Sequence, residues 1–283
     1  MKNFILCVML TLIASSVSAE DVKVSVSEVR DSRTTGQFFA GLEIKLKAMG
    51  DNIADARGIR MNVTKAIDDT GRDLLKKDSD KRTEFTKPDE NNSGQAEIEI
   101  KLKNPSRKAA SVSELSGEIV IFAPKKDPNA TAEIAAFMTM AGKPVENSAL
   151  KNAHVEIAIM TKKQFDDFKE KQKKEVKAKE GEIIRELGEA MAKALGALFE
   201  GMMEIGENSV ILNIADPDSK VIELEFLDAG GGAIKSFSTM KTGDIRVYEF
   251  DKPMPPDARL RIFMMTPKSL MKTGFKLTDI TLP

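Results

Sequence analysis

The chain has 283 residues, and its 43 Lys and Arg residues are almost balanced by 44 Asp and Glu residues, which leaves a formal net charge of -1. Such a balance gives the protein no electrostatic reason to bind nucleic acid or an anionic membrane. There is no Trp and one Tyr, so the exposed aromatic faces that sugar-binding surfaces and single-strand grooves use for stacking are scarce. These features disfavour a nucleic-acid binder and a lectin.

The N-terminal residues have the pattern of a secretory signal peptide. Lys2 is followed by the apolar run FILCVMLTLIA and then by small residues that end at Ala19, which gives a basic start, an apolar core and a cleavage site. The run is too short to span a bilayer, which takes roughly 20 residues, and no later segment has that unbroken apolar length. We expect cleavage after residues 1–19 and export of the mature chain, from Glu20 onward, to the periplasm or the exterior.

Removal of this peptide would also remove Cys7, the single Cys of the chain. The mature protein would then enter an oxidising compartment without a disulfide, although small exported domains commonly depend on them. Its stability must therefore come from the burial of apolar side chains, for which the length is sufficient in two domains.

Residues 20–161 have the pattern of a β domain. Apolar residues alternate with polar ones in several runs, and a period of two with one apolar face is typical of half-buried antiparallel strands. Turn-forming sequences separate the runs, for example around Gly71 and Pro105. The apolar stretch 131–140 lacks the alternation and receives no assignment. The alternating positions are Val22, Val24 and Val26; Leu42, Ile44 and Leu46; Ile59, Met61 and Val63; Ile98, Ile100 and Leu102; Ile119 and Ile121; Val155, Ile157 and Ile159.

Residues 162–207 differ from the rest of the chain and predict a helical connector. The first half mixes Lys with Asp and Glu at helical spacing, which usually marks a solvated helix face supported by local ion pairs. The second half has apolar residues every three or four positions, which places them on one face of a helix. Gly181, between the halves, indicates a bend or break.

The apolar stripe of this connector must be buried against something, because burial of apolar surface is favourable by about 25 cal/mol of free energy per Å². Two interpretations stay open. The stripe packs on the β domains of its own chain, or it binds another protein or a second copy of the chain. In the second interpretation the partner contacts are Ile184, Leu187, Met191, Leu195, Leu198 and Phe199, in a stripe that also includes Ile183 and Met202.

Residues 208–283 return to the β pattern, with strands expected over 210–214, 221–227, 233–237, 245–250, 260–265 and 275–280. The expected fold is mainly β with one long helical segment: two immunoglobulin-like antiparallel β-sandwich domains joined by a helix, the second domain being smaller. Residues 67–74 and 227–234 also resemble each other, each with Asp at the end of an apolar run and then a Gly turn. Either a duplicated sandwich or two hairpins with similar turn chemistry would explain this sequence similarity.

Several Asp residues are candidates for metal binding or catalysis. Asp68, Asp69 and Asp73 lie near one turn and could hold a calcium ion, because hard cations take carboxylate and carbonyl oxygens. Their spacing does not match an EF-hand, and Asp in a turn often bonds its own backbone, which is the favoured explanation. A carboxylate pair is also the catalytic machinery of glycosidases. For that role the sequence offers, besides the first cluster, Asp216 with Asp218 and Asp166 with Asp167.

Other common chemistries lack their residues. His154 is the only His, and a single His without Cys cannot build the usual zinc sites. No Gly-x-Ser-x-Gly elbow is present for a Ser-His-Asp triad, and no phosphate loop or GxGxxG stands between a strand and a helix. His154 is expected on the solvated face of a strand, beside Glu156. We expect no cofactor.

The run LKNPSRKAA (102–110), continuing into SELSGEI (113–119), resembles segments of uncharacterised exported bacterial β-sandwich proteins, as does the stretch from Pro255 through Thr266 to Ser269. The resemblance implies an exported β-sandwich protein and assigns no catalytic residue. The leading hypothesis is therefore a non-catalytic interaction or structural module of the cell envelope or exterior. The alternative is a carboxylate-based, glycosidase-like hydrolase with its site at a sandwich edge.

Overall fold

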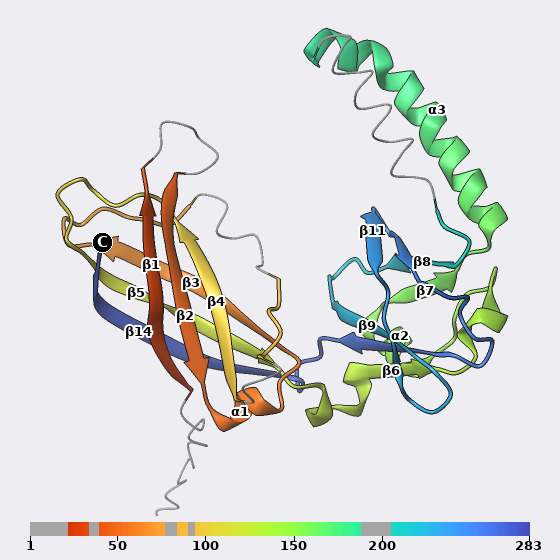
Figure 1. Ribbon diagram of the computed structural model, residues 1–283, viewed down its shortest axis with the longest axis horizontal. Helices are drawn as coiled ribbons and strands as arrows, with labels where there is room; N and C mark the ends of the chain where they lie inside the picture. The colour runs from red at the N-terminus through yellow and green to blue at the C-terminus, as the bar shows by residue number, and fades with distance from the viewer. Residues whose placement is uncertain (1–21, 34–39, 77–83, 90–93, 188–204) are drawn as a thin grey trace, which may run out of the picture. The chain divides into compact units, whose positions relative to one another are not determined.

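The computed structural model describes residues 22–33, 40–76, 84–89, 94–187 and 205–283, and within 175–187 it describes the backbone. The protein is mainly β, and its sheets are antiparallel (Figure 1). The chain divides into two compact units, Met1–Ile121 with Lys272–Pro283 and Phe122–Met271. These limits differ from the expected domains 20–161 and 208–283, because the second unit takes its strands from both sides of the helical segment.

The first unit contains two three-stranded sheets. The strand orders are β1-β2-β4 and β14-β5-β3, so the last strand of the chain lies beside β5. A one-turn helix, α1 (Asp51–Ala54), follows β2. The strands are β1 (Lys23–Ser32), β2 (Gly41–Met49), β3 (Gly58–Asp68), β4 (Gln95–Leu102), β5 (Ser111–Phe122) and β14 (Leu270–Thr281).

Alternation in β2 and β4 separates a buried face from a charged face. Leu46 faces Ile98 and both are buried, whereas on the other face Lys45 faces Glu99. Lys45 also forms a 2.8 Å ion pair with Glu28 of β1. A row of opposite charges therefore crosses the three strands on the polar face, and such cross-strand pairs favour one register. The strands expected from the runs at 42–46 and 98–102 are confirmed.

The edge strand β1 contains a bulge that its sequence pattern required. Val24 and Val26 pair with Ala48 and Leu46, on the apolar face of β2. The register shifts between Val26 and Glu28, so that Val29 then pairs with Ile44 on the same face. One extra residue shifts the alternation of side chains between the two faces of a strand by one position. The bulge therefore places Val29 on the same apolar face as Val24 and Val26.

The second unit contains two four-stranded sheets with the orders β10-β9-β13-β6 and β11-β12-β8-β7. Its strands are β6 (Thr131–Ile134), β7 (Glu156–Ile159), β8 (Ser209–Ala215), β9 (Val221–Leu227), β10 (Ala233–Ile234), β11 (Ser238–Thr242), β12 (Ile245–Glu249) and β13 (Arg259–Met264). The short helices are η1 (Pro124–Lys126), η2 (Pro128–Ala130), η3 (Phe137–Met140) and α2 (Ser148–Ala153). β6 and η3 lie in the stretch 131–140, which the sequence left unassigned.

One apolar core takes its side chains from both sheets of this unit. It includes Leu212 of β8 and Leu260 and Ile262 of β13, none of them exposed. Phe226 lies at the centre of an aromatic group, with ring centroids 4.9 Å from Tyr248 and 5.0 Å from Phe250, both edge-on. Edge-on contacts are a preferred geometry for aromatic pairs. The unit is therefore sandwich-like, with most of the sequence alternation directed into this core.

The long helix α3 (Lys162–Leu187) does not join two domains in this structure. It stands in the chain between β7 and β8, which pair with each other as neighbours in one sheet, so the helical segment interrupts what would otherwise be a β-hairpin. The expected helical connector is therefore corrected to an insertion within the second unit. The helix also continues through Gly181, where a break was expected.

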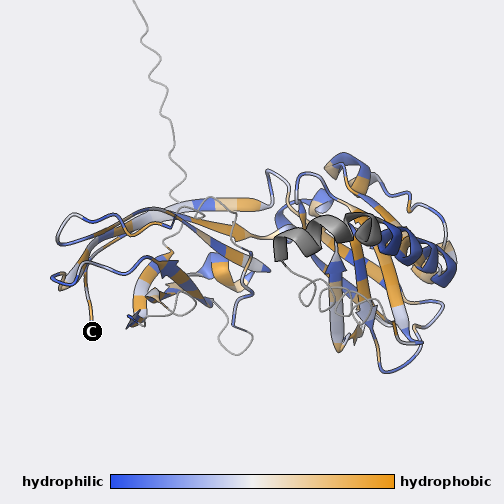
Figure 2. Ribbon diagram, turned by 90° about the horizontal axis from the view of Figure 1, so that it is seen from above, coloured by the Kyte–Doolittle hydropathy of each residue, from blue (hydrophilic) through white to orange (hydrophobic). Residues whose placement is uncertain are grey.

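The first turns of α3 fix it to the outer face of the β8–β12 pair. Phe165 is fully buried against Ile211 and Val247, and Phe168 stacks on it at 6.2 Å between ring centroids. Ile205, where the described chain resumes, packs on the same cluster. The segment thus leaves the sheet and returns to it at one apolar patch. Residues 162–174 of α3 are mostly hydrophilic, whereas the strands alternate hydrophilic and hydrophobic residues (Figure 2). No helix within the described residues has both the length and the apolar content to cross a membrane.

Candidate functional site

A groove of about 990 Å³ lies at one end of the second unit, within the size range of ligand sites. It is formed by α2, the segment before it, the start of β7 and the end of β8. The lining residues are Pro144, Val145, Glu146, Asn147, Ser148, Leu150, Lys151, His154, Val155, Glu156, Ile157, Ala215 and Pro217.

Local capping bonds shape the helix that forms one wall. Asn147 Oδ1 accepts hydrogen bonds from the amides of Ala149 (2.9 Å) and Leu150 (3.3 Å), which otherwise lack partners at a helix start. The helix ends at His154, whose backbone is left-handed with φ of 56°. The chain then turns back, and the Val155 amide donates to the Leu150 carbonyl at 3.0 Å. Leu150 and Val155 are thereby brought together as buried apolar side chains under the groove.

Four ionisable side chains, Glu146, Lys151, His154 and Glu156, line this groove, and all four are exposed. Within the described part of the chain, none of the four side chains has a hydrogen bond or an ion pair. The groove therefore presents an apolar floor with unpaired charges of both signs beside it.

Two of these charges occupy opposed positions in an antiparallel pair. Pro144 bridges to Ala158, and the Val145 amide donates to the Ile157 carbonyl at 2.8 Å. Continuing this register by one residue places Glu146 opposite Glu156. Like charges directly opposite each other on neighbouring strands are destabilising. This arrangement therefore does not stabilise the fold, and it gives the groove an acidic side.

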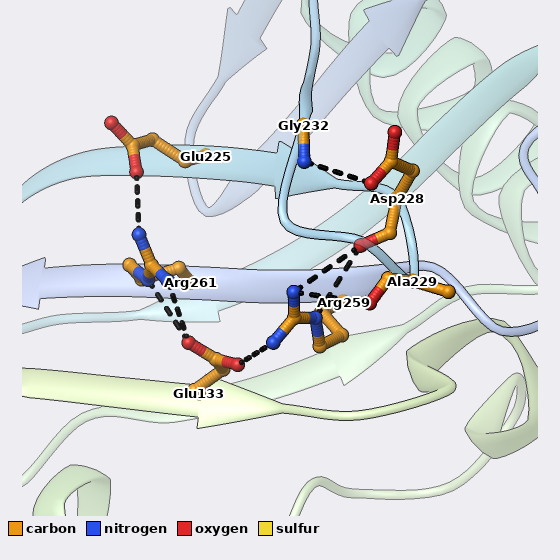
Figure 3. A network of polar contacts seen from close by, with 7 residues as sticks. All are labelled: Glu133, Glu225, Asp228, Ala229, Gly232, Arg259 and Arg261. Atoms are coloured by element: carbon orange, nitrogen blue, oxygen red, sulfur yellow. Dashed lines mark hydrogen bonds and ion pairs between the residues drawn. The ribbon is translucent and has the colours of Figure 1, made fainter.

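Charges on the neighbouring sheet behave differently, because they neutralise one another. Glu133 of β6 accepts hydrogen bonds from Arg259 (2.8 Å) and Arg261 (2.9 Å), and Arg261 reaches Glu225 at 3.5 Å (Figure 3). The hydrogen bond from Arg261 lowers the pKa of Glu133, an effect that outweighs its partial burial. This network joins three strands and leaves its members mutually satisfied, in contrast to the groove.

The opposite rim of the groove is held by the turn between β8 and β9. Both carboxylate oxygens of Asp216 are occupied, by the amides of Lys220 and Val221 at 2.8 Å each. The ammonium group of Lys220 donates to the Ala153 carbonyl at 2.9 Å and pairs with Asp218 at 3.0 Å. The turn that carries Pro217 is therefore fixed to the end of α2, which gives the groove a defined wall.

The proposed calcium residues do not gather around a common point. Asp68 accepts bonds from the amides of Thr70, Arg72 and Ser106 and from the Thr70 hydroxyl, at 2.7–2.9 Å. Asp69 accepts the Ala110 amide, and Asp73 accepts the Leu75 amide. Within the described ranges there is no group of three or more His, Cys, Asp or Glu side chains placed to hold a metal ion. These carboxylates act as acceptors in turns.

Other sequence candidates lie on α3 and at the end of α2. Asp166 forms a 2.9 Å ion pair with Lys169 one turn later in α3, and Asp167 is exposed beside it. His154 lies at the end of α2, and the expected position on a strand face was wrong. The partner-binding stripe falls outside the described residues: Ile184 and Leu187 have only their backbone described, and Met191, Leu195, Leu198 and Phe199 have nothing described. That assignment stays a prediction.

Sequence reasoning named His154 but did not connect it to Glu146, Lys151 or Glu156. One signal was present, since Asn147 before Ser-Ala-Leu-Lys-Asn has the composition of a helix start. The pairing of residues 144–146 with β7 is a tertiary contact with no local pattern. Comparisons of the chain with protein-family models, with curated proteins and with solved structures gave no match.

Proposed function

We propose that this protein is an exported, non-catalytic binding module that holds a peptide-like ligand in the groove between α2 and β7. Export rests on the expected signal peptide of residues 1–19. An immunoglobulin-like arrangement, which commonly serves binding, is part of the proposal. The periplasm and the cell exterior fit equally well.

One observation supports binding at this groove. Its ionisable side chains are unpaired, whereas comparable charges nearby, such as Glu133 and Arg261, are paired. Unpaired charges over the buried Leu150, Val155 and Ile157 fit a ligand that has both charged and apolar groups. A peptide segment has both, and its charges would complete the pairs that Lys151 and Glu156 lack within the described chain.

The test is selection of short peptides from a displayed random library on the mature protein. A double charge reversal, Glu146→Lys with Glu156→Lys, should lower the affinity of the selected peptides about tenfold or more, because both exposed residues line the groove. The matched control is Glu97→Lys, an exposed carboxylate on β4 of the other unit. Peptides that bind wild type and the double variant equally well would refute the groove as the site.

A hydrolase remains the second candidate, because Glu146 and Glu156 face one groove at opposed positions. Two carboxylates across a cleft are the requirement of glycosidases. Against it, both side chains are exposed, whereas the acid of such a pair usually stands in a desolvated site. Assay with aryl glycosides decides: a hydrolase would lose its turnover in both Glu146→Gln and Glu156→Gln, and a binding module shows no turnover in wild type.

A further inference from the structure

Phe237 is the most exposed large apolar residue of the described chain. Phe237 is 65% exposed, and the next such residue, Val26, is 36% exposed. Phe237 directly precedes β11, and its amide donates to the Glu249 carbonyl of β12 at 3.0 Å. The backbone that carries this ring is thus held in place while the ring itself is left in water.

The strand that follows Phe237 is the edge of its sheet. β11 pairs with β12 on one side and is the last strand in the order β11-β12-β8-β7. The end strand of the other sheet, β10, has two residues and is joined to β11 by residues 235–237. The inner face of β11 is therefore poorly covered: Thr239 faces the buried Tyr248 across the pair but is itself exposed.

Two cationic side chains lie opposite each other at this edge. Lys241 of β11 lies directly opposite Arg246 of β12. Arg246 bonds the Tyr248 side chain, and within the described residues neither cation has a carboxylate partner. Two like charges directly opposite on paired strands oppose folding, and a carboxylate placed beside them would remove that cost. Lys235, exposed two residues before Phe237, adds a third positive charge.

A Lys on an edge strand has a simpler use, since it discourages pairing with other chains. That use accounts for Lys241 alone. It does not account for an exposed Phe at the start of the same edge, because an apolar ring favours the association that the Lys would prevent. Aromatic side chains are among the groups that most often anchor protein interfaces.

We propose that β11 is a docking edge for an extended, acidic segment of a partner protein, which adds to the sheet as a further strand. Backbone pairing with the free edge provides affinity, as in other strand-addition complexes. Phe237 packs against an apolar side chain of the segment, and a carboxylate of the segment lies beside Lys241 and Arg246. This surface is separate from the groove at α2, so its test is independent of the proposed groove function.

The probe is a short fluorescent peptide of alternating Glu and Val, with a twin in which Lys replaces Glu. Binding to the mature chain is measured by polarisation at low and high salt. The acidic peptide should bind, more weakly as salt rises, and the Lys twin should not. Phe237→Ser and Lys241→Glu should each weaken binding about tenfold or more. Val26→Ser and Lys23→Glu, the matched pair on edge strand β1, should change it by less than about twofold.

Amide exchange then locates the peptide. Bound peptide should slow exchange along Ser238–Thr242, because added backbone hydrogen bonds protect edge amides. Absence of binding at millimolar peptide, equal binding of the Lys twin, or equal losses in the β1 controls would overturn the proposal. So would dimerisation of the wild-type chain that Phe237→Ser abolishes, since the occupant would then be a second copy.

Discussion

Asp68 and Asp228 close the same turn in the two different units. The Asp68 carboxylate accepts the amide of Arg72 at 2.9 Å, and the Asp228 carboxylate accepts the amide of Gly232 at 2.8 Å, in each case four residues later. The residue three positions after each Asp is a glycine with positive φ, 85° at Gly71 and 91° at Gly231. The sequence similarity between residues 67–74 and 227–234 therefore corresponds to the same type of hydrogen-bonded turn, which forms once in each unit.

A third turn of this kind weakens the case that the sequence similarity reflects a duplicated domain. Asp216 accepts the amide of Lys220, again four residues later, and Ser219 between them has φ of 53°. This turn joins β8 to β9, which belong to different sheets. The same turn thus forms in a different topological setting. Hydrogen bonds from an Asp carboxylate to its own turn are therefore sufficient to explain the sequence similarity without duplication of a domain.

The two matching carboxylates should differ in their contribution to stability. Asp68 is 1% exposed and also accepts the Ser106 amide at 2.8 Å, whereas Asp228 is exposed. Asp68→Asn removes the charge and places an NH₂ donor against one of these donors, so we expect a loss of about 3 kcal/mol in unfolding free energy. Asp228→Asn should lose less than about 1 kcal/mol. Urea unfolding followed by circular dichroism measures both, and equal losses would contradict this account.

Acid should remove the contribution of Asp68. Burial alone would raise its pKa, but the hydrogen bonds from Ser106, Thr70 and Arg72 outweigh burial, and the pKa is lowered from 3.8. A carboxyl with a lowered folded pKa stabilises the protein above its unfolded pKa, and this stability is lost as pH falls through the folded pKa. The stability difference between wild type and Asp68→Asn should therefore be constant from about pH 7 to 5 and shrink below about pH 4. A constant difference down to pH 2 would argue against it.

Chelation should leave the protein unchanged. The oxygens of Asp68 already accept four hydrogen bonds from N–H and O–H donors, and a calcium ion would have to displace them. We therefore expect the same melting temperature with excess EDTA and with added calcium. A melting temperature that falls with EDTA and recovers with calcium would restore the calcium interpretation of Asp68, Asp69 and Asp73.

Two glycines of one sheet should respond differently to a methyl group. A Cβ on Gly117 of β5 would collide with the Asn62 carbonyl oxygen, which is backbone and cannot turn away. On Gly274 of β14 the nearest neighbour would be 3.8 Å away. Gly117→Ala should therefore cost about 3 kcal/mol or prevent folding, while Gly274→Ala should stay within about 1 kcal/mol of wild type. Thermal and urea unfolding provide the comparison, and a stable Gly117→Ala protein would show that β3 and β5 can separate locally.

The strands with clean alternation were predictable, and their partners were not. The runs at 42–46 and 98–102 became β2 and β4, because one face of each is buried. Local pattern carries no information about which sheet a strand joins, so the pairing of β7 with β8 across the helical segment was missed. β11 was also missed, because an exposed edge strand such as STMKT has no apolar face to reveal it.

The groove was less predictable than the fold. Its residues belong to a capped helix of six residues and to a strand edge, and they meet only because the chain reverses at His154. Exposed Glu and Lys occur throughout the sequence, and their lack of partners becomes visible only in three dimensions. The exposure of Phe237 at the proposed docking edge was also missed. The sequence predicted a strand over 233–237 that would include Phe237, whereas β10 ends at Ile234.

The attachment of α3 should depend on one side chain. Phe165 is fully buried against the outer face of the β8–β12 pair, whereas Phe168 is half-buried. Phe165→Ala should cost about 3 kcal/mol and release the helix start, so that trypsin cuts earlier at the exposed Lys162, Lys163 and Lys171. Phe168→Ala, the matched control, should cost about 1 kcal/mol and leave cleavage nearly unchanged. Brief digestion read by mass spectrometry reports the order of the cuts. If Phe165→Ala cleaves at the wild-type rate, contacts other than this ring hold the segment to the sheet, and the apolar stripe of the helical segment becomes the first candidate for them.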